Sequence, residues 1–368
     1  MSGTESDLMA RAVALGEDGR RSAPPNPWVG CVVVDDRGEI AGEGWHRRPG
    51  TPHAEADALR AAGERARGGT ACVTLEPCAH HGRTPPCAYA LISAGVRRAV
   101  VALEDPDPQV AGRGVARLRA AGIEVELGTG AVAARRSLAP YLHHRRTGRA
   151  WCLVKTATTL DGKVAAADGS SRWITGAAAR ADAHRIRAES QAVVVGAGTA
   201  LADHPSLTAR DVDPPVVRQP LRVLLDARGR VPATGPLFDT ALAPTLVITT
   251  DAAPNAAVDA WCAAGTKVET VPAAPGGVDL AATLDLLGRF DVLQAMVEGG
   301  PTVHGALLGA GLADRVVAYV APKVLGPRAV PAFPQPGPAS IADATDWRLL
   351  SAAALGDDVR LEYEPGER

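Results

Sequence analysis

The sequence predicts an α/β protein built from two domains. Three observations support this prediction: a length of 368 residues, apolar strand-like runs that alternate with helical patterns, and a short basic turn before the middle of the chain. The length exceeds what one average domain needs. Alternating strands and helices favour largely parallel sheets covered by helices. We place the domain boundary in the turn Arg145–Arg149, which gives domains 1–147 and 148–368.

The composition narrows the class of protein. Hydrophobic residues make up 46% and charged residues 22% of the chain, as in globular proteins with a sizeable core. The net charge of −2 gives no basic excess for nucleic acid. The sequence has no apolar run of about 18 residues, and Met1–Arg21 lacks the apolar stretch of a signal peptide. Together with six cysteines in a long chain, these features predict a cytoplasmic protein with reduced thiols, without nucleic-acid or membrane partners. A homo-oligomer is expected as well, although composition does not predict it.

The first domain begins with an amphipathic helix, and its turn residues and apolar runs divide the remainder into strands and helices. The turn Asp35–Gly38 separates two strand-like runs and therefore indicates a hairpin. The predicted strands are 28–34, 40–46, 70–75, 98–103 and 124–127, and the predicted helices are 53–66, 87–94, 113–121 and 133–144.

His53, Cys78 and Cys87 form a candidate zinc site. One imidazole and two thiolates suit tetrahedral zinc, and three protein ligands leave the fourth position for water. Zinc lowers the pKa of bound water to about 7. Glu55, two residues after His53, is the candidate group that moves a proton between the water and a leaving amine. The combination of His-x-Glu with a later Pro-Cys is typical of zinc nucleobase deaminases.

Two alternatives concern the residues around this site. A closed structural zinc knuckle is disfavoured because the sequence has no fourth Cys or His at knuckle spacing. His80 and His81 are alternative ligands on paper, although their loop position favours the pocket or its rim. Asn26 lies in the proline-rich turn 24–27. It is either a turn residue or an amide that binds both a donor and an acceptor on a heterocycle.

The second domain continues the alternation of strands and helices. The predicted strands are 151–156, 193–195, 221–226, 246–249, 267–271 and 292–297, with helices at 178–189, 255–264, 280–287 and 302–310. Residues 347–354 and 359–363 are predicted to close an antiparallel edge. The run Val193–Leu201 begins like a dinucleotide fingerprint but has Leu201 at the third glycine position. The turn Glu298–Thr302 is better placed, as either a phosphate-binding turn or a plain strand-to-helix turn.

Motifs in both halves resemble one family, the bifunctional riboflavin-biosynthesis deaminase/reductases. In the first half these are Asn26–Cys31, His53–Ala56, Thr74–Cys78 and His81–Cys87; in the second half they are Lys155–Lys163, Ser171–Thr175, Asp203–Thr208 and Glu298–Thr302. The loop before Cys87 resembles the family's own form of the second zinc motif. The resemblance implies a cytidine-deaminase-like αβα sandwich followed by a dihydrofolate-reductase-like α/β domain that binds NADPH. Asp107 stands where the family usually has Asn.

The resemblance also implies roles for individual residues. Cofactor contacts are expected from Ala157, Trp173, Thr199, Asp203, Gly300, Pro301, Thr302, Val303, His304, Gly305 and Ala306. Substrate contacts are expected from Ser171, Arg187, Leu207, Arg210 and Glu298. Guanidinium groups suit a sugar phosphate, although each arginine taken alone would be interpreted as a surface charge.

The implied function is two consecutive steps of riboflavin biosynthesis. The zinc site would hydrolyse the 2-amino group of 2,5-diamino-6-(5-phosphoribosylamino)pyrimidin-4(3H)-one. The second domain would then use NADPH to reduce the ribosyl side chain of 5-amino-6-(5-phosphoribosylamino)uracil to the ribityl chain. Three alternatives remain: a nucleic-acid base deaminase, a reductase with an inert deaminase half, and a non-catalytic zinc-binding regulator. The slightly acidic chain disfavours the nucleic-acid base deaminase. The complete set of zinc-site residues disfavours an inert deaminase half, and the poised glutamate disfavours a non-catalytic regulator.

Overall fold

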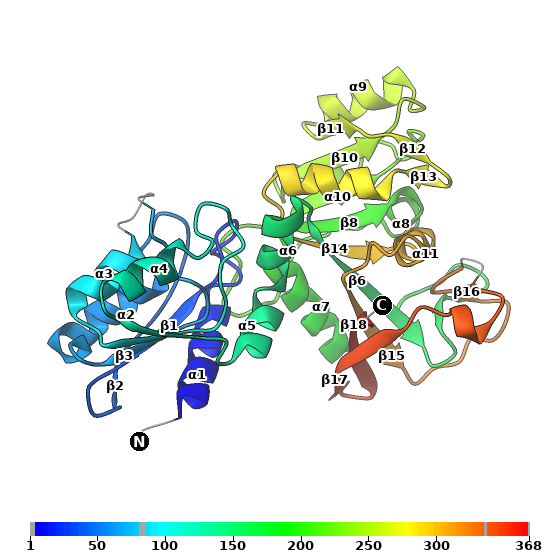
Figure 1. The fold of residues 1–368 in the computed structure, drawn as a ribbon. Coiled ribbons are helices and arrows are strands. Elements are labelled where there is room, and N and C mark those ends of the chain that lie inside the picture. The colour runs from blue at the N-terminus through cyan, green and yellow to red at the C-terminus, as the bar shows by residue number, and fades with distance from the viewer. Residues whose placement is uncertain (1–3, 81–85, 335–336, 367–368) are drawn as a thin grey trace. The chain divides into compact units, whose positions relative to one another are not determined.

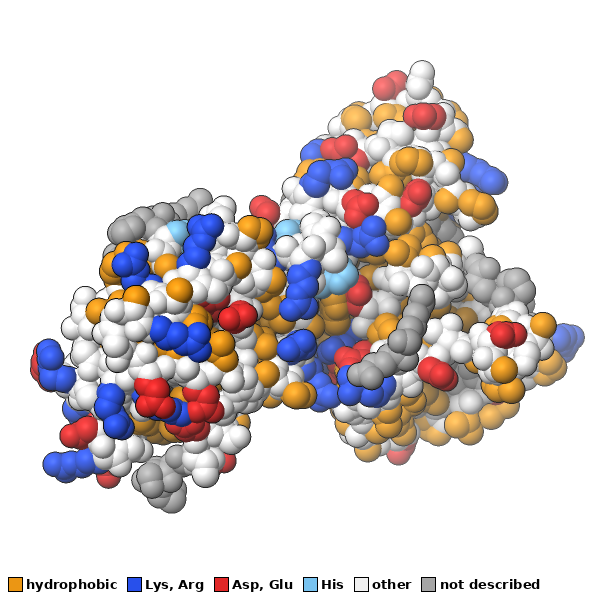
Figure 2. Space-filling view, in the orientation of Figure 1, with side chains coloured by type: hydrophobic (Ala, Val, Ile, Leu, Met, Phe, Trp, Pro, Cys, Tyr) orange, Lys and Arg blue, Asp and Glu red, His pale blue; other side chains and the backbone are white. Residues whose placement is uncertain are grey.

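A computed structural model describes residues 4–80, 86–334 and 337–366. The chain divides into two compact units, Met1–Gly148 and Arg149–Arg368 (Figure 1). Acidic, basic and apolar side chains are interspersed over the face of the first unit in Figure 2. Within the described ranges, no helix is both long and apolar enough to cross a bilayer.

The first unit contains one five-stranded sheet with helices packed around it. Its strands are β1 (Gly30–Val34), β2 (Ile40–Trp45), β3 (Thr70–Val73), β4 (Arg98–Val101) and β5 (Glu124–Leu127). Its helices are α1 (Glu5–Glu17), α2 (Ala54–Ala62), α3 (Cys87–Ala94), α4 (Arg113–Ala120), α5 (Ala131–Ser137) and α6 (Ala139–Thr147), with a 3₁₀ turn η1 (Gly63–Ala66). The strand order is β2-β1-β3-β4-β5, and β3, β4 and β5 run parallel.

The single helix predicted over 133–144 is wrong. The structure has two helices, α5 and α6, which meet at Leu138. Pro140 lies in the first turn of α6, where its missing N–H needs no partner. In an uninterrupted helix the same ring would clash with the carbonyl of Arg136, so the proline ends one helix and starts the next.

The second unit is built on a nine-stranded sheet and two small two-stranded sheets, β12-β13 and β16-β7. The strands of the whole unit are β6 (Trp151–Thr159), β7 (Lys163–Ala165), β8 (Ala192–Gly196), β9 (Leu221–Leu225), β10 (Thr245–Thr249), β11 (Lys267–Thr270), β12 (Ala273–Ala274), β13 (Gly277–Val278), β14 (Gln294–Gly299), β15 (Arg315–Ala321), β16 (Val330–Pro331), β17 (Trp347–Leu355) and β18 (Asp358–Pro365). Its helices are α7 (Ala177–Glu189), α8 (Ala197–Asp203), α9 (Asn255–Ala263), α10 (Leu280–Arg289) and α11 (Pro301–Gly309), with 3₁₀ turns η2 (Pro236–Phe238) and η3 (Ile341–Asp343).

The large sheet has the order β11-β10-β9-β8-β14-β6-β15-β18-β17. All neighbouring pairs from β11 to β15 are parallel. The predicted antiparallel edge is confirmed, because β18 pairs antiparallel with both β15 and β17. The sequence analysis missed β15 and α8. The second of these is only seven residues long.

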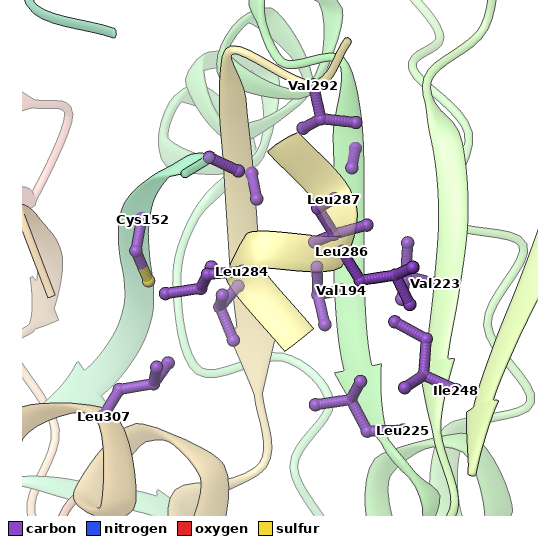
Figure 3. Packing of buried hydrophobic residues seen from close by; sticks show 14 of the residues in the cluster. Cys152, Val194, Val223, Leu225, Ile248, Leu284, Leu286, Leu287, Val292 and Leu307 are labelled. Carbon is purple, nitrogen blue, oxygen red and sulfur yellow. The ribbon is translucent and has the colours of Figure 1, made fainter. Parts of the chain in front are cut away.

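Both faces of the parallel sheet are covered in the second unit. Leu284 and Leu287 of α10 pack with Val194, Val223 and Ile248 on one face (Figure 3). On the other face, the neighbouring strand residues form a second cluster with the buried Trp261. Strands buried on both faces read as continuous apolar runs, which explains why the sequence located them. Most polar residues that could take part in chemistry therefore lie at the strand ends and in the loops that follow.

Candidate active sites

The first candidate site lies where β3 and two helix starts meet. His53 is the N-cap of α2, Cys78 follows β3, and Cys87 is the first residue of α3. His53 Nδ1 lies 3.7 Å from Cys78 Sγ and 3.4 Å from Cys87 Sγ. All three ligating atoms lie within 4.8 Å of one another. Such spacing allows all three atoms to bind one metal ion, and one imidazole with two thiolates suits a zinc ion with a fourth position for water.

The surroundings of Cys78 favour the thiolate that zinc requires. The backbone N–H of Cys87, at the start of α3, donates to Cys78 Sγ at 3.4 Å. Hydrogen bonds from the Cys87 thiol and from His53 lower the pKa of Cys78 to about 4, although burial opposes the shift. The pKa of Cys87 is raised in turn, chiefly because its thiol donates to Cys78. A helix N-terminus and a donor network thus stabilise negative charge at the cluster.

Glu55 projects from the first turn of α2, two residues after His53, and only 3% of it is exposed. Burial raises the pKa of its carboxyl group from 4.5 to about 7. A carboxyl group with a pKa near neutrality can both accept and donate a proton. Glu55 is therefore well suited to proton transfer beside the three ligands.

Asn26 contacts a histidine that the sequence analysis did not single out. The Asn26 amide Nδ2 lies 3.0 Å from His46 Nε2, and the other ring nitrogen of His46 lies 3.2 Å from the carbonyl oxygen of Pro52. The His46 ring packs edge-on against His53, with 5.0 Å between the ring centroids. If the amide donates to His46, its Oδ1 is left to accept a bond from a ligand. His80 is exposed, whereas the predicted loop residues 81–85 lie outside the described residues.

Glu76 is a second residue that the sequence analysis did not assign. Its buried carboxylate accepts backbone N–H bonds from Gly112, Gly114, Val115 and Asp105 at 2.8–3.3 Å. Three of these donors belong to the first turn of α4 or its cap, so Glu76 caps that helix from the segment after β3. Because Cys78 follows two residues later, this contact also fixes the segment that carries the ligand.

The second candidate site begins with an ion pair at the end of β14. Arg187 Nη2 lies 2.7 Å from Glu298 Oε2, and Arg187 Nε contacts the other carboxylate oxygen. Arg187 Nη1 donates to the carbonyl oxygen of Thr208 at 3.0 Å. Although burial opposes the shift, Arg187 lowers the pKa of Glu298 to about 2. The guanidinium fork is thus occupied by Glu298 and Thr208, so Arg187 ties the carboxylate to the backbone at Thr208.

Further basic side chains surround this pair. Lys155 of β6 is close enough to interact electrostatically with Glu298 and Arg187, and burial lowers its pKa. His184 Nδ1 lies 3.4 Å from the backbone nitrogen of Arg210. Burial and the two arginines lower the pKa of His184 to about 4. Arg210 itself is exposed, and its guanidinium donates to Ser206 Oγ at 3.3 Å, which leaves most of its donors for an anion.

The turn after β14 approaches α8 closely. Gly300 is the N-cap of α11, and a Cβ atom there would lie 2.9 Å from Thr199 Oγ1. A Cβ atom at Gly198, in the first turn of α8, would meet nothing within 4 Å, so the space beside this residue is open. Two neighbouring glycine turns and the N-terminus of α11 fit the pyrophosphate of a dinucleotide. His304 Nε2 lies 3.1 Å from the carbonyl oxygen of Val297, which ties α11 to the strand.

The structure also shows the surroundings of three further predicted residues, Asp203, Trp173 and Leu207. Arg172 donates to the carbonyl oxygen of Asp203, the last residue of α8, at 2.8 Å. The ring of Trp173 is 61% exposed and lies 4.5 Å from the guanidinium carbon of Arg180. Leu207 is buried and has a left-handed backbone with a φ of 53°. Other predicted residues, whose positions are given by the secondary structure alone, are Ala157 in β6, Ser171 after β7, and Pro301, Thr302, Val303, Gly305 and Ala306 in α11.

Comparisons with protein families divide the chain in the same way as the two candidate sites. Residues 2–103 match the cytidine and deoxycytidylate deaminase zinc-binding region. Residues 150–361 match the RibD C-terminal domain.

Full-length relatives and solved structures are also similar to this chain. The riboflavin biosynthesis protein RibD of Escherichia coli K12 is 42% identical, with 96% of this chain and 97% of the relative covered. The Chlamydia pneumoniae protein of the same name is 43% identical over 97% of this chain and 94% of its own. Acinetobacter baumannii RibD has a TM-score of 0.88 at 39% identity, covering 99% of both chains. A Thermotoga maritima diaminohydroxyphosphoribosylaminopyrimidine deaminase/5-amino-6-(5-phosphoribosylamino)uracil reductase has a TM-score of 0.85 at 32% identity, covering 98% of this chain and 99% of its own.

Proposed function

Because this chain belongs to the RibD family of riboflavin-biosynthesis proteins, we propose that its two candidate sites carry out the family's deaminase and reductase steps in turn. The substrate of the first step would be 2,5-diamino-6-(5-phosphoribosylamino)pyrimidin-4(3H)-one, and its product 5-amino-6-(5-phosphoribosylamino)uracil. The second step would reduce the ribosyl chain of that product to a ribityl chain. Zinc and NADPH are the cofactors.

In the deaminase unit, His53, Cys78 and Cys87 would hold the metal. A zinc ion held there would lower the pKa of a bound water to about 7 and so would supply a nucleophile at neutral pH. Glu55 takes the proton from the attacking water and passes it to the 2-amino group, which leaves as ammonia. Asn26, aligned by His46, holds the pyrimidine edge in the orientation that this attack needs.

In the reductase unit, Gly300, the first turns of α11 and Thr199 would hold the dinucleotide, which would supply the hydride to C1 of the ribose. Arg187 keeps Glu298 ionised and fixed, so that it accepts hydrogen bonds from the substrate. Lys155, buried beside this pair, holds the proton that the opening sugar oxygen requires. Arg210 would bind the substrate phosphate with the donors that Ser206 leaves available.

The observation that carries this proposal is the buried Glu55 beside three ligating atoms within 4.8 Å of one another. The test is a pair of assays on wild type, Glu55→Gln and Arg210→Ala. Ammonia release is measured on the diaminopyrimidine ribotide, and NADPH oxidation on the separately supplied deaminated ribotide. Glu55→Gln should abolish ammonia release, retain zinc and leave NADPH oxidation unchanged. Arg210→Ala should raise KM for NADPH oxidation alone.

The same assays address the alternatives. If zinc-loaded wild type oxidises NADPH but releases no ammonia, the deaminase half is inert or acts on another substrate. Ammonia release from single-stranded DNA or RNA, but not from the ribotide, would instead indicate a nucleic-acid base deaminase. A zinc-loaded protein without either activity would indicate a regulator.

We also propose self-association and a cytoplasmic location. Leu349 of β17 and Val359 of β18 are 52% and 41% exposed, and β17 is the last strand of the large sheet. Outer strands with exposed apolar side chains favour pairing with a second copy. Light scattering on wild type and Leu349→Lys tests this, since the variant should shift the mass toward the monomer. The free cysteines of the described chain suit a reducing compartment.

A further inference from the structure

Two arginines follow β9 without an assigned role. Arg228 and Arg230 are both exposed, and their side chains have no hydrogen-bond or ion-pair partner among the described residues. Most arginines near the reductase site are engaged, as Arg187 is with Glu298. Two free guanidinium groups separated by a single glycine therefore form a local excess of positive charge that is available to an anion.

The loop that carries these arginines is built rigidly. Asp226 is 1% exposed, and its carboxylate accepts the backbone N–H of Arg228 at 3.3 Å and of Val231 at 2.7 Å. Thr250 donates its hydroxyl to the carbonyl oxygen of Ala227 at 2.8 Å. Gly229 has a φ of 69°, and a Cβ there would lie 2.9 Å from atoms of Ala257 and Pro254. These contacts fix the loop backbone from both sides, so the two arginine side chains extend from Cα atoms in fixed positions.

The topology places this loop on the same edge of the sheet as the glycine turns. β9 runs parallel to β8, and Leu225 pairs with Gly196, the residue that caps α8. On the other side of β8, Val195 pairs with Gly299 of β14. The loop 226–230 therefore lies beside the start of α8, about 10 Å (two strand spacings) from the turn that begins α11. The segment after Arg230 packs against α8, because Val231 and Ala200 share one apolar cluster.

The direction of the dinucleotide follows from where the substrate groups lie. Glu298 ends β14, and Lys155 belongs to β6, the next strand on the side away from β8. The nicotinamide must meet the substrate there, so with its pyrophosphate at the α11 N-terminus the adenosine half extends toward β8 and β9. The acidic groups on this side are Asp226, whose oxygens are used by the backbone, and the exposed Asp251 after β10.

We propose that Arg228 and Arg230 bind the 2′-phosphate of NADPH and thereby select it over NADH. This inference rests on the proposed reductase function, and it assigns the specificity of that site to two residues. The 2′-phosphate is the one group that distinguishes the two nucleotides, and it carries the charge that two unpaired guanidinium groups would neutralise.

The test is calorimetric binding to the full-length protein, without turnover. The probes are 2′,5′-ADP and 5′-AMP, which differ only by the 2′-phosphate. Wild type should bind 2′,5′-ADP more tightly. Arg228→Gln and Arg230→Gln should each weaken 2′,5′-ADP about tenfold, as expected for losing one charge-assisted hydrogen bond, and should leave 5′-AMP unchanged. Arg218→Gln is the matched control, because Arg218 is also exposed but precedes β9 and so lies toward the opposite edge.

The outcomes separate this inference from the function on which it rests. The assignment is overturned if the variants bind 2′,5′-ADP as tightly as wild type does, or if they lose affinity for both probes equally. In either case, NADPH binding by wild type would still support the proposed reductase function. Wild type that binds neither NADPH nor 2′,5′-ADP overturns the reductase proposal itself. Circular dichroism of each variant checks that the fold is retained.

Discussion

Removing the Glu76 carboxylate should destabilise the deaminase unit although Glu76 contacts no ligand atom. Glu76→Ala removes the acceptor of four backbone N–H groups, those of Asp105, Gly112, Gly114 and Val115. The Glu76 side chain is 4% exposed, so water does not readily replace it. The first turn of α4 would lose its cap, and the loop that precedes the helix would lose its anchor.

The magnitude follows from the donors that are left without a partner. The bonds to Asp105, Gly114 and Val115 are buried, and an unsatisfied buried donor costs about 1–3 kcal/mol. Partial relaxation keeps the sum below three full penalties, so we expect a loss of about 4 kcal/mol in the free energy of unfolding. For a unit of this size, such a loss lowers Tm by about 12 °C. Glu76→Gln keeps one acceptor oxygen and should lose about half as much.

The assay is urea unfolding followed by zinc release to a chromogenic chelator, because this signal reports the deaminase unit alone. Glu64→Ala is the matched control. Glu64 is in the same unit with a side chain that is 97% exposed, so its replacement should change stability by less than about 0.5 kcal/mol. NADPH oxidation at ambient temperature should remain in all three variants. A Glu76→Ala midpoint equal to that of wild type would refute the capping argument.

Two further predictions concern a close contact and a buried charge. A Cβ at Gly114 would lie 1.8 Å from the carbonyl oxygen of Pro77. Gly114→Ala should therefore displace α4 from the segment before Cys78 and lower the zinc content measured by elemental analysis. Full zinc occupancy in this variant would contradict the prediction. Burial raises the pKa of Glu298, but Arg187 lowers it from 4.5 to about 2, so the pair stabilises above pH 4.5 and this stability is lost as pH falls toward 2. In Arg187→Met, burial dominates and the pKa of Glu298 rises above 4.5. The Tm of the reductase unit in this variant should therefore be higher at pH 5 than at pH 8. An equal Tm at both pH values would count against the pairing.

The sequence located most strands and helices because their signals are local. Strands covered on both faces read as apolar runs, and α3 begins and ends where the sequence predicts, at Cys87 and Ala94. The sequence also singled out His53, Cys78 and Cys87, and the structure brings their ligating atoms within 4.8 Å of one another. Their role as zinc ligands stays a prediction. The break at Leu138 carried a signal too, namely Pro140, but the apolar pattern on both sides concealed it.

Contacts between distant residues could not be predicted in this way. Glu76 accepts bonds from residues 29 to 39 positions later, and nothing in its neighbours indicates a helix cap. Arg187 and Glu298 are 111 positions apart, so their pairing depends on how α7 packs beside β14. His46 appears in the sequence as the end of a strand, and only the fold brings it against Asn26 and His53. These residues act through other residues, and such a role leaves no pattern in a single sequence.

The two chemistries are separable because each unit supplies its own site. The three proposed zinc ligands, Glu55 and the residues that support them all lie between Asn26 and Val115. The groups around Glu298 and the glycine turns lie between Lys155 and His304. In both units most of these groups stand where a strand of a covered sheet passes into a loop or helix, so the core fixes the backbone that carries them. A substitution at either site should therefore abolish one reaction and leave the other at its wild-type rate, which is why paired assays on one chain can test both assignments.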